Sequence, residues 1–123
     1  MAAPNLIAAT AIYGKTTAVS LTTTSATSVL SNAASSGKCL KINTVNVANT
    51  SLNTVSVTLV WNNAASLAGT SFAIASTISV PANTTLNIID KTSQYYLEEN
   101  QSLGATASTS TTLVVTCSYE DIS

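Results

Sequence analysis

Large apolar side chains alternate with small polar ones along most of this chain, a pattern that suits extended strands and leaves little room for helices. The alternation is clearest in residues 55–61, 72–80 and 113–120, where for example Val57 and Leu59 flank Thr58. Because successive side chains of a strand point to opposite faces, each run gathers its large residues on one face. Many of the polar positions are Thr, whose branched Cβ fits an exposed pleat. The pattern predicts an all-β protein.

The remaining strands are shorter or less regular. We expect them at Thr17–Thr22, Thr27–Leu30, Cys39–Ala48, Thr84–Ile89, Tyr95–Leu97 and Ser102–Ser108. A change of parity at Asn43–Thr44 predicts a bulge in the third of these. Turn residues such as Asn, Ser, Pro and Gly separate the runs. Only Ala64–Gly69 has helical character, enough for a single turn.

Eight or nine short strands at this spacing predict an antiparallel β-sandwich, jelly-roll-like in its connections. The shared parity within the strands predicts a core that includes Val57, Leu59, Phe72, Ile74, Ile78, Leu113 and Val115. A chain of 123 residues is long enough for one such core. We expect a single sandwich domain over residues 15–123, preceded by an extended N-terminal arm over residues 1–14.

The composition removes most catalytic chemistry. Thr, Ser, Ala and Asn supply 68 of the 123 residues, nine residues are charged, and the chain has no His and no Arg. General acid–base catalysis needs His or a carboxylate pair with separated pKa values. Glu98 and Glu99 are adjacent, so on a strand they point to opposite faces and do not form such a pair. We therefore expect no enzyme activity, no catalytic residue, no cofactor and no metal site; a calcium site drawing on Asp90, Glu98, Glu99 or Asn100 has no loop motif behind it.

Nucleic acid and membranes are also excluded as partners by the sequence. Four Lys and a net charge of −1 do not make the basic surface that nucleic acid requires. No segment approaches the roughly 20 continuous apolar residues of a membrane span. The N-terminus has no Lys or Arg before Lys15, unlike a signal peptide, which favours synthesis in the cytoplasm. In that compartment Cys39 and Cys117 are expected to be reduced, buried residues.

Five segments, taken in order, resemble one group of proteins. They are residues 12–16 (IYGKT), 31–38 (SNAASSGK), 45–49 (VNVAN), 78–82 (ISVPA) and 118–123 (SYEDIS). Together they resemble small virion structural proteins of tailed bacteriophages, particularly those that infect cyanobacteria and other aquatic bacteria. The resemblance implies a virion protein made in the host cytoplasm, with capsid decoration (cement) as the leading role and a tail, neck or baseplate component as the alternative. It implies no catalytic residues.

Assembly with other copies is the function that the composition favours. A surface with few charges leaves neutral area for contact and limits repulsion between like copies. The candidate assembly contacts are the apolar residues of the arm, Leu6, Ile7, Ile12 and Tyr13. Homotrimers bound to phage capsid or other virion proteins are the favoured partners, by analogy with the local three-fold positions of a viral shell. Two other classes remain open: a secreted adhesin, and a carbohydrate-binding module that uses aromatic residues such as Tyr95 and Tyr96.

Overall fold

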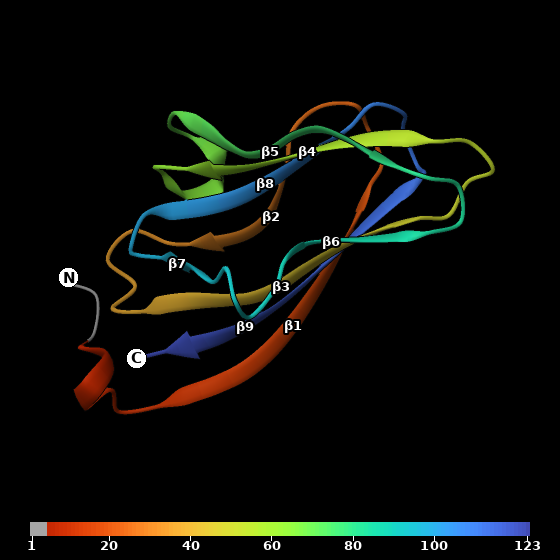
Figure 1. Ribbon diagram of the computed structural model, residues 1–123. Helices are drawn as coiled ribbons and strands as arrows, with labels where there is room; N and C mark the ends of the chain where they lie inside the picture. The colour runs from red at the N-terminus through yellow and green to blue at the C-terminus, as the bar shows by residue number, and fades with distance from the viewer. Residues whose placement is uncertain (1–4) are drawn as a thin grey trace.

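The computed structural model describes residues 5–123, which form two antiparallel β-sheets packed face to face (Figure 1). The nine strands are β1 (Ile12–Leu21), β2 (Thr27–Asn32), β3 (Cys39–Asn49), β4 (Val55–Asn62), β5 (Ser71–Val80), β6 (Thr85–Ile89), β7 (Tyr95–Leu97), β8 (Gln101–Ala107) and β9 (Leu113–Ile122). Two short 3₁₀ turns, η1 (Leu6–Ala8) and η2 (Ala65–Leu67), complete the elements. The expected all-β sandwich is confirmed, and η2 lies where a single helical turn was expected.

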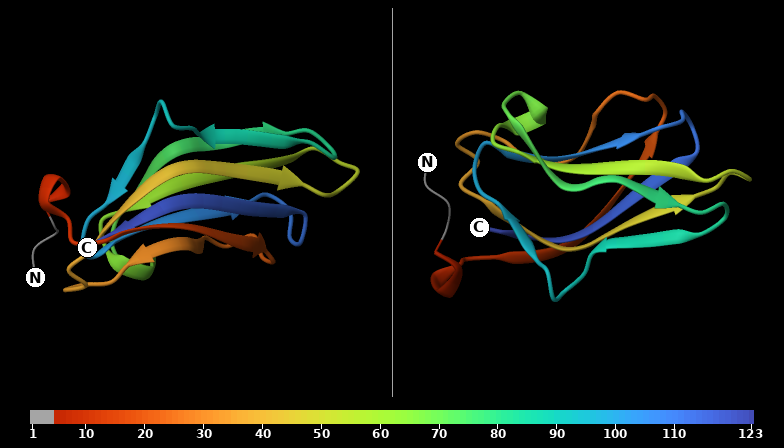
Figure 2. Two further views of the ribbon diagram at one scale, coloured as in Figure 1. Left: turned by 90° about the horizontal axis from the view of Figure 1, so that it is seen from below. Right: turned by 45° about the horizontal axis from the view of Figure 1, so that its top comes forward.

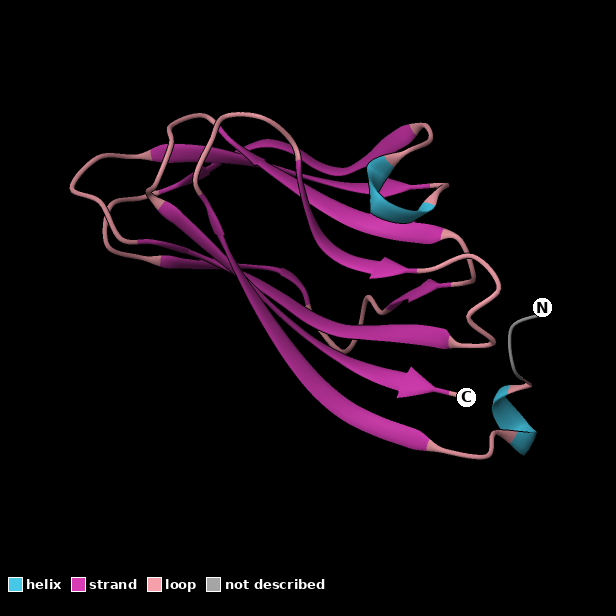
Figure 3. Cartoon of the chain, turned by 180° about the vertical axis from the view of Figure 1, so that it is seen from behind, coloured by secondary structure: helices cyan, strands magenta, loops and turns pink. Residues whose placement is uncertain are grey.

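The strand order is that of a jelly roll. One sheet has the order β1-β9-β3-β6, with β7 also paired to β3, and the other has the order β2-β8-β4-β5. Consecutive strands therefore cross repeatedly between the sheets, as the colours of Figure 2 show. Strands β1 and β9 run side by side over ten residue pairs, so the two ends of the chain belong to one sheet. Seen from behind, the strands dominate the molecule and both helical turns lie at the same end of the sandwich (Figure 3).

The core lies between the sheets and is aliphatic. Val57, Leu59 and Val115 are fully buried and Leu113 is nearly so, as their parity predicted. The predicted bulge is also confirmed, because the pairing of β3 with β9 shifts between Ile42 and Thr44. The extra residue there lets both halves of β3 direct their large side chains inward.

Two of the predicted core residues are not buried. Phe72 is 53% exposed and Ile78 is 38% exposed, whereas Ile74 is partly buried against the core. All three lie on β5, which is an edge strand with two register shifts against β4. At one of these shifts Thr77 has a φ of 51° and donates its backbone N–H to Thr58 Oγ1. Parity therefore predicted the correct face of the sheet for Phe72 and Ile78. These side chains remain partly exposed because β5 has a neighbouring strand on one side only.

The N-terminal arm is shorter than expected. Ile12, Tyr13 and Gly14 belong to β1 and pair with Ile122, Asp121 and Glu120. The first part of the expected arm, residues 1–4, lies outside the described residues. Residues 5–11 precede the sheet, and η1 within them lies just before the start of β1 (Figure 1).

Three strands end on a buried asparagine. Asn32, Asn49 and Asn62 are the last residues of β2, β3 and β4, and each is no more than 2% exposed. The side-chain amide of Asn49 donates to the carbonyl oxygens of Asn53 and Val80, both at 2.8 Å. A buried amide is stable only when its donors and acceptor are satisfied, so each residue fixes the course of the loop that follows it.

Gly104 on β8 shows why a small residue is needed beneath η2. A Cβ at this position would lie 2.7 Å from Leu67 Cδ2. The hydroxyl of Ser102 completes the contact by donating to Ala64 O at 2.7 Å and accepting from Leu67 N at 3.0 Å.

Within residues 5–123, no helix has the length and apolar character needed to cross a membrane.

Candidate functional site

The apolar residues singled out in the arm lie at the start of β1 and do not form one cluster. Leu6 and Ile7 are on η1, where they are 45% and 98% exposed. Ile12 and Tyr13 are the first two residues of β1, so their side chains point to opposite faces of the sheet. We define residues 5–9 as the docking segment, because they stand outside the sheet and include Ile7, the most exposed residue of this set.

The docking segment is held in a defined conformation although it stands outside the sandwich. Asn5 Oδ1 accepts a hydrogen bond from Ile7 N at 3.0 Å and caps the turn. Further along the chain, Thr10 N and Ala11 N donate to Ser123 O at 2.6 and 3.0 Å. Ser123 N donates back to Ala11 O at 2.9 Å, which extends the pairing of β1 and β9 to the base of the segment. The segment is therefore presented in a preorganised form.

A hollow of about 380 Å³ opens between the two sheets, at the edge of the sandwich that lies across the strand order from β1. Strands β4 and β5 of one sheet and β7 of the other form its walls, and its lining consists of Trp61, Phe72, Ala73, Ile74, Tyr95 and Tyr96. We call this feature the aromatic hollow. It contains four of the six aromatic residues of the chain.

Strand register explains why these aromatic rings face the gap. Directly paired residues of antiparallel strands have their side chains on the same face. Trp61 is paired with Phe72 on one side and with the fully buried Leu103 on the other. Tyr95 is paired with the fully buried Ile42. All three rings therefore point toward the core layer, at a place where the sheets do not cover it.

The chemistry of the aromatic hollow is apolar. The rings of Trp61 and Phe72 have centroids 5.8 Å apart and planes tilted by 36°, a favourable aromatic arrangement. None of the six lining residues is charged. Trp61 packs against the core, and the sequence did not indicate that Phe72 and Tyr95 meet it across a gap. These rings are brought together by pairing between segments far apart in the sequence. The sequence therefore signalled the hollow only through the aromatic character of its residues.

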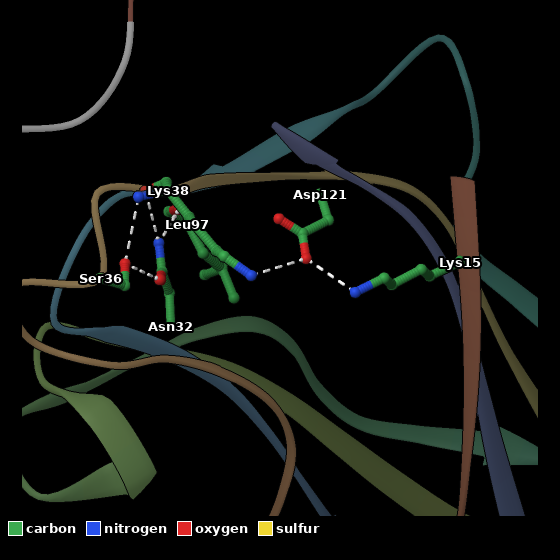
Figure 4. A network of polar contacts seen from close by, with 6 residues as sticks. All are labelled: Lys15, Asn32, Ser36, Lys38, Leu97 and Asp121. Carbon is green, nitrogen blue, oxygen red and sulfur yellow. Dashed lines mark hydrogen bonds and ion pairs between the residues drawn. The ribbon is translucent and has the colours of Figure 1, made fainter. Parts of the chain in front are cut away.

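The edge formed by β1 and β2, on the side of the docking segment, contains a charged cluster. The carboxylate of Asp121 is 7% exposed and accepts from Lys15 Nζ at 2.8 Å and Lys38 Nζ at 3.2 Å through the same oxygen (Figure 4). Burial alone would raise the pKa of Asp121, but the hydrogen bonds from the two lysines outweigh it and hold this pKa below its usual value. The same contact raises the pKa of Lys15. The cluster stabilises the end of β9 where the inward face is no longer apolar.

Asn32 connects this cluster to the second sheet. Its side-chain nitrogen donates to Lys38 O at 2.9 Å and Leu97 O at 3.0 Å, and its oxygen accepts from Ser36 Oγ at 2.6 Å (Figure 4). A hollow of about 260 Å³ lies beside these residues and beside Asp121. Its charged groups are already paired with each other, so it offers no free charge to a ligand.

Most of the remaining surface is uncharged. Lys41 Nζ lies 3.7 Å from Glu120 Oε2, so three of the four lysines are paired with carboxylates of β9 at one end of the molecule. Glu98 accepts from Gln101 Nε2 at 3.4 Å and Glu99 accepts from Gly37 N at 3.2 Å, and the two do not converge on one site. Among residues 5–123 no group of three Cys, Asp or Glu side chains is placed to hold a metal ion.

The two cysteines are buried and separate. Cys117 is paired with Val45 of β3, six residues along the strand from Cys39, which corresponds to about 20 Å. A disulfide within the chain is therefore excluded, since its Cα atoms must lie within roughly 7 Å. Burial raises the pKa of Cys117 to about 12 and also raises that of Cys39, so neither thiol is an activated nucleophile.

No protein-family model matches the chain, and no curated protein matches it. Among solved structures, the chain is similar to a protein of infectious bursal disease virus, Gx strain, with 12% identity and a TM-score of 0.28. The similarity covers 89% of this chain and 40% of that one, so the chain spans less than half the length of the viral protein.

Proposed function

We propose that the chain is a non-enzymatic structural subunit of a virion and that its role is capsid decoration. The proposal rests on one observation: a sandwich with only nine charged residues exposes apolar side chains at two separate places, the docking segment and the aromatic hollow. Soluble monomers rarely expose large apolar side chains in groups without a partner to cover them. A subunit that works inside an assembly has such partners.

The charge distribution supports this reading. Copies of one protein that pack on a lattice bring identical surfaces close together, and uncharged surfaces avoid repulsion at that distance. Here three lysines are neutralised by Asp121 and Glu120 at one end, which leaves the sheet faces polar but neutral. Symmetric, multivalent contact then lets modest single interfaces give lasting attachment.

The architecture supports the proposal by analogy only. Jelly rolls occur in viral capsid domains and also in lectins and other proteins. Capsid decoration is preferred to a tail, neck or baseplate position because a repeated shell offers many equivalent sites for a small neutral subunit.

Cryo-EM of the intact particles, together with mass spectrometry of their proteins, tests the proposal. We expect the sandwich to be found at regular positions on the outer surface of the shell. Density for the same sandwich at the tail, neck or baseplate would keep the virion role and overturn decoration. Absence of the chain from purified particles would overturn the proposal as a whole.

A further inference from the structure

We propose that the docking segment of one copy occupies the aromatic hollow of the next copy. The inference rests on the proposed function and names the contact by which copies associate. Both surfaces belong to every copy, so one chain supplies a donor and an acceptor.

The donor is Ile7, supported by Leu6. Ile7 is 98% exposed, which means that almost none of its side chain contacts its own sandwich. The Asn5 cap and the hydrogen bonds of Thr10 and Ala11 to Ser123 nevertheless hold the backbone around it. A segment that is already ordered loses little conformational entropy when it binds. An ordered aliphatic residue with no partner in its own fold is suited to insertion elsewhere.

The acceptor is the aromatic hollow. Its rings come from two sheets and leave a gap of about 380 Å³ between them, close to the lower end of the usual size of binding pockets. Because no lining residue is charged, the hollow favours an apolar, uncharged occupant. The docking segment meets that requirement, since residues 5–14 contain no charged side chain.

A copy does not fill its own hollow. Register places Tyr95 three strands away from β1, through Ile42 and Tyr119 to Lys15. Three strand spacings amount to about 14 Å. Ile7 lies only three residues from Thr10, which is fixed to Ser123, so the chain between them spans at most about 10 Å. The hollow is also displaced along the strands, because Tyr95 is level with Lys15, five residues or about 16 Å from Thr10. The two displacements are at right angles, so the segment reaches only the hollow of another copy.

Donor and acceptor on opposite edges produce a head-to-tail contact. Such a heterologous interface forms a closed ring when the rotation between copies allows it and an open chain when it does not. A three-membered ring is the closed form that agrees with the trimers expected on a shell. An isologous dimer would instead make this contact twice about one two-fold axis, with the segment of each copy in the hollow of the other, and light scattering separates such a dimer from a larger ring or chain.

Full-length protein with single substitutions tests the contact. Ile7→Asn removes the donor and Phe72→Gln alters the acceptor, and both residues are more than half exposed, so both variants should fold. Leu52→Asn is the matched control, because Leu52 is 84% exposed and lies in the loop between β3 and β4. Light scattering over a range of concentrations measures association, and Trp61, the only tryptophan, reports on the hollow through its fluorescence.

We expect Ile7→Asn and Phe72→Gln each to weaken association by about ten- to a hundredfold, as central apolar contacts of interfaces do. Leu52→Asn should associate as the wild type does. A mixture of the two defective variants should form dimers and nothing larger, because it contains one intact donor and one intact acceptor per pair. The emission of Trp61 should move to shorter wavelength as the wild type assembles, and a peptide of residues 1–12 should produce the same change.

Three results would overturn the inference: a wild type that stays monomeric at every concentration, a control variant as defective as Ile7→Asn, or Trp61 emission that responds to neutral oligosaccharides and not to the peptide. The last result would make the hollow a carbohydrate site. Particle binding is measured in parallel. Wild-type protein that binds particles without the head-to-tail contact leaves the proposed function intact, whereas protein absent from particles removes that function instead.

Discussion

Replacing Asn49 by Ala tests whether the buried asparagines hold the sandwich together. Asn49 ends β3, and its side chain makes four hydrogen bonds. It donates to Asn53 O and Val80 O and accepts from the backbone N–H and the hydroxyl of Ser51 at 2.9 and 2.8 Å. Alanine removes all four hydrogen bonds. Some of the partner groups that it leaves unpaired are accessible to water and others are buried.

The expected loss of stability follows from those contacts. A hydrogen bond contributes about 1 kcal/mol net, and a buried group left without a partner costs about 1–3 kcal/mol. The bond to Val80 O is buried, whereas the hydroxyl of Ser51 is able to turn to solvent. We therefore expect a loss of about 3–4 kcal/mol, a large share of the roughly 5–15 kcal/mol available to a domain.

Urea denaturation followed by Trp61 fluorescence and far-UV circular dichroism measures this loss. Asn53→Ala is the matched control, because it makes the same replacement in the same loop, where the Asn53 side chain is exposed and the contacts of that residue use its backbone. We expect this variant to change the free energy of unfolding by less than about 0.5 kcal/mol. An Asn49→Ala variant within about 1 kcal/mol of the wild type, or no less stable than Asn53→Ala, would refute the reasoning.

Three further predictions concern the core, the charged cluster and the thiols. Leu59→Ala should destabilise the protein by about 2–5 kcal/mol in denaturation experiments, and Phe72→Ala by less, because Leu59 is fully buried and Phe72 is 53% exposed. Asp121→Asn should lower stability at pH 7 by about 1–2 kcal/mol, since its lysine partners are half exposed. The lowered pKa of Asp121 means that its contribution is present above pH 4 and is lost as pH falls through the folded pKa, so the variant should show a shallower loss of stability in acid. Cys39 and Cys117 should react slowly with a thiol reagent at pH 8 in the folded protein and at once in urea; fast labelling of the native protein would contradict their burial.

The sandwich was predictable because its signal is local and repeated. Alternation marks strands such as β4 and β9 without reference to any other part of the chain. The bulge in β3 was predictable for the same reason, since a change of parity near Asn43 is visible in the sequence. Exposure at Phe72 was not predictable, because it depends on β5 being an edge strand, and neighbours in a sheet are set by contacts far apart in the sequence.

The buried asparagines show a different limit. Asn49 and Asn53 both read as turn residues, yet one is 2% exposed with four side-chain hydrogen bonds and the other is exposed. What distinguishes them is the carbonyl of Val80, which the fold brings from 31 residues away. A polar residue type alone does not indicate whether its partner is water or a distant backbone.

The aromatic hollow was hidden from sequence analysis because it depends on which strands lie at an edge and on contacts between distant residues. An inward parity normally means burial, and Trp61, Phe72 and Tyr95 all have it, yet the gap between β5 and β7 leaves part of the core layer open. A sandwich that uses its rings only for stability would close this edge, because exposed aromatic area contributes nothing to folding. The hollow beside Asp121 is polar and its charged groups are paired with one another, so the two hollows of the chain differ in chemistry and only the one at β5 and β7 is apolar. An apolar opening of this kind is expected where a second molecule completes the core, and the proposed occupant, Ile7, has the most exposed large apolar side chain among residues 5–123.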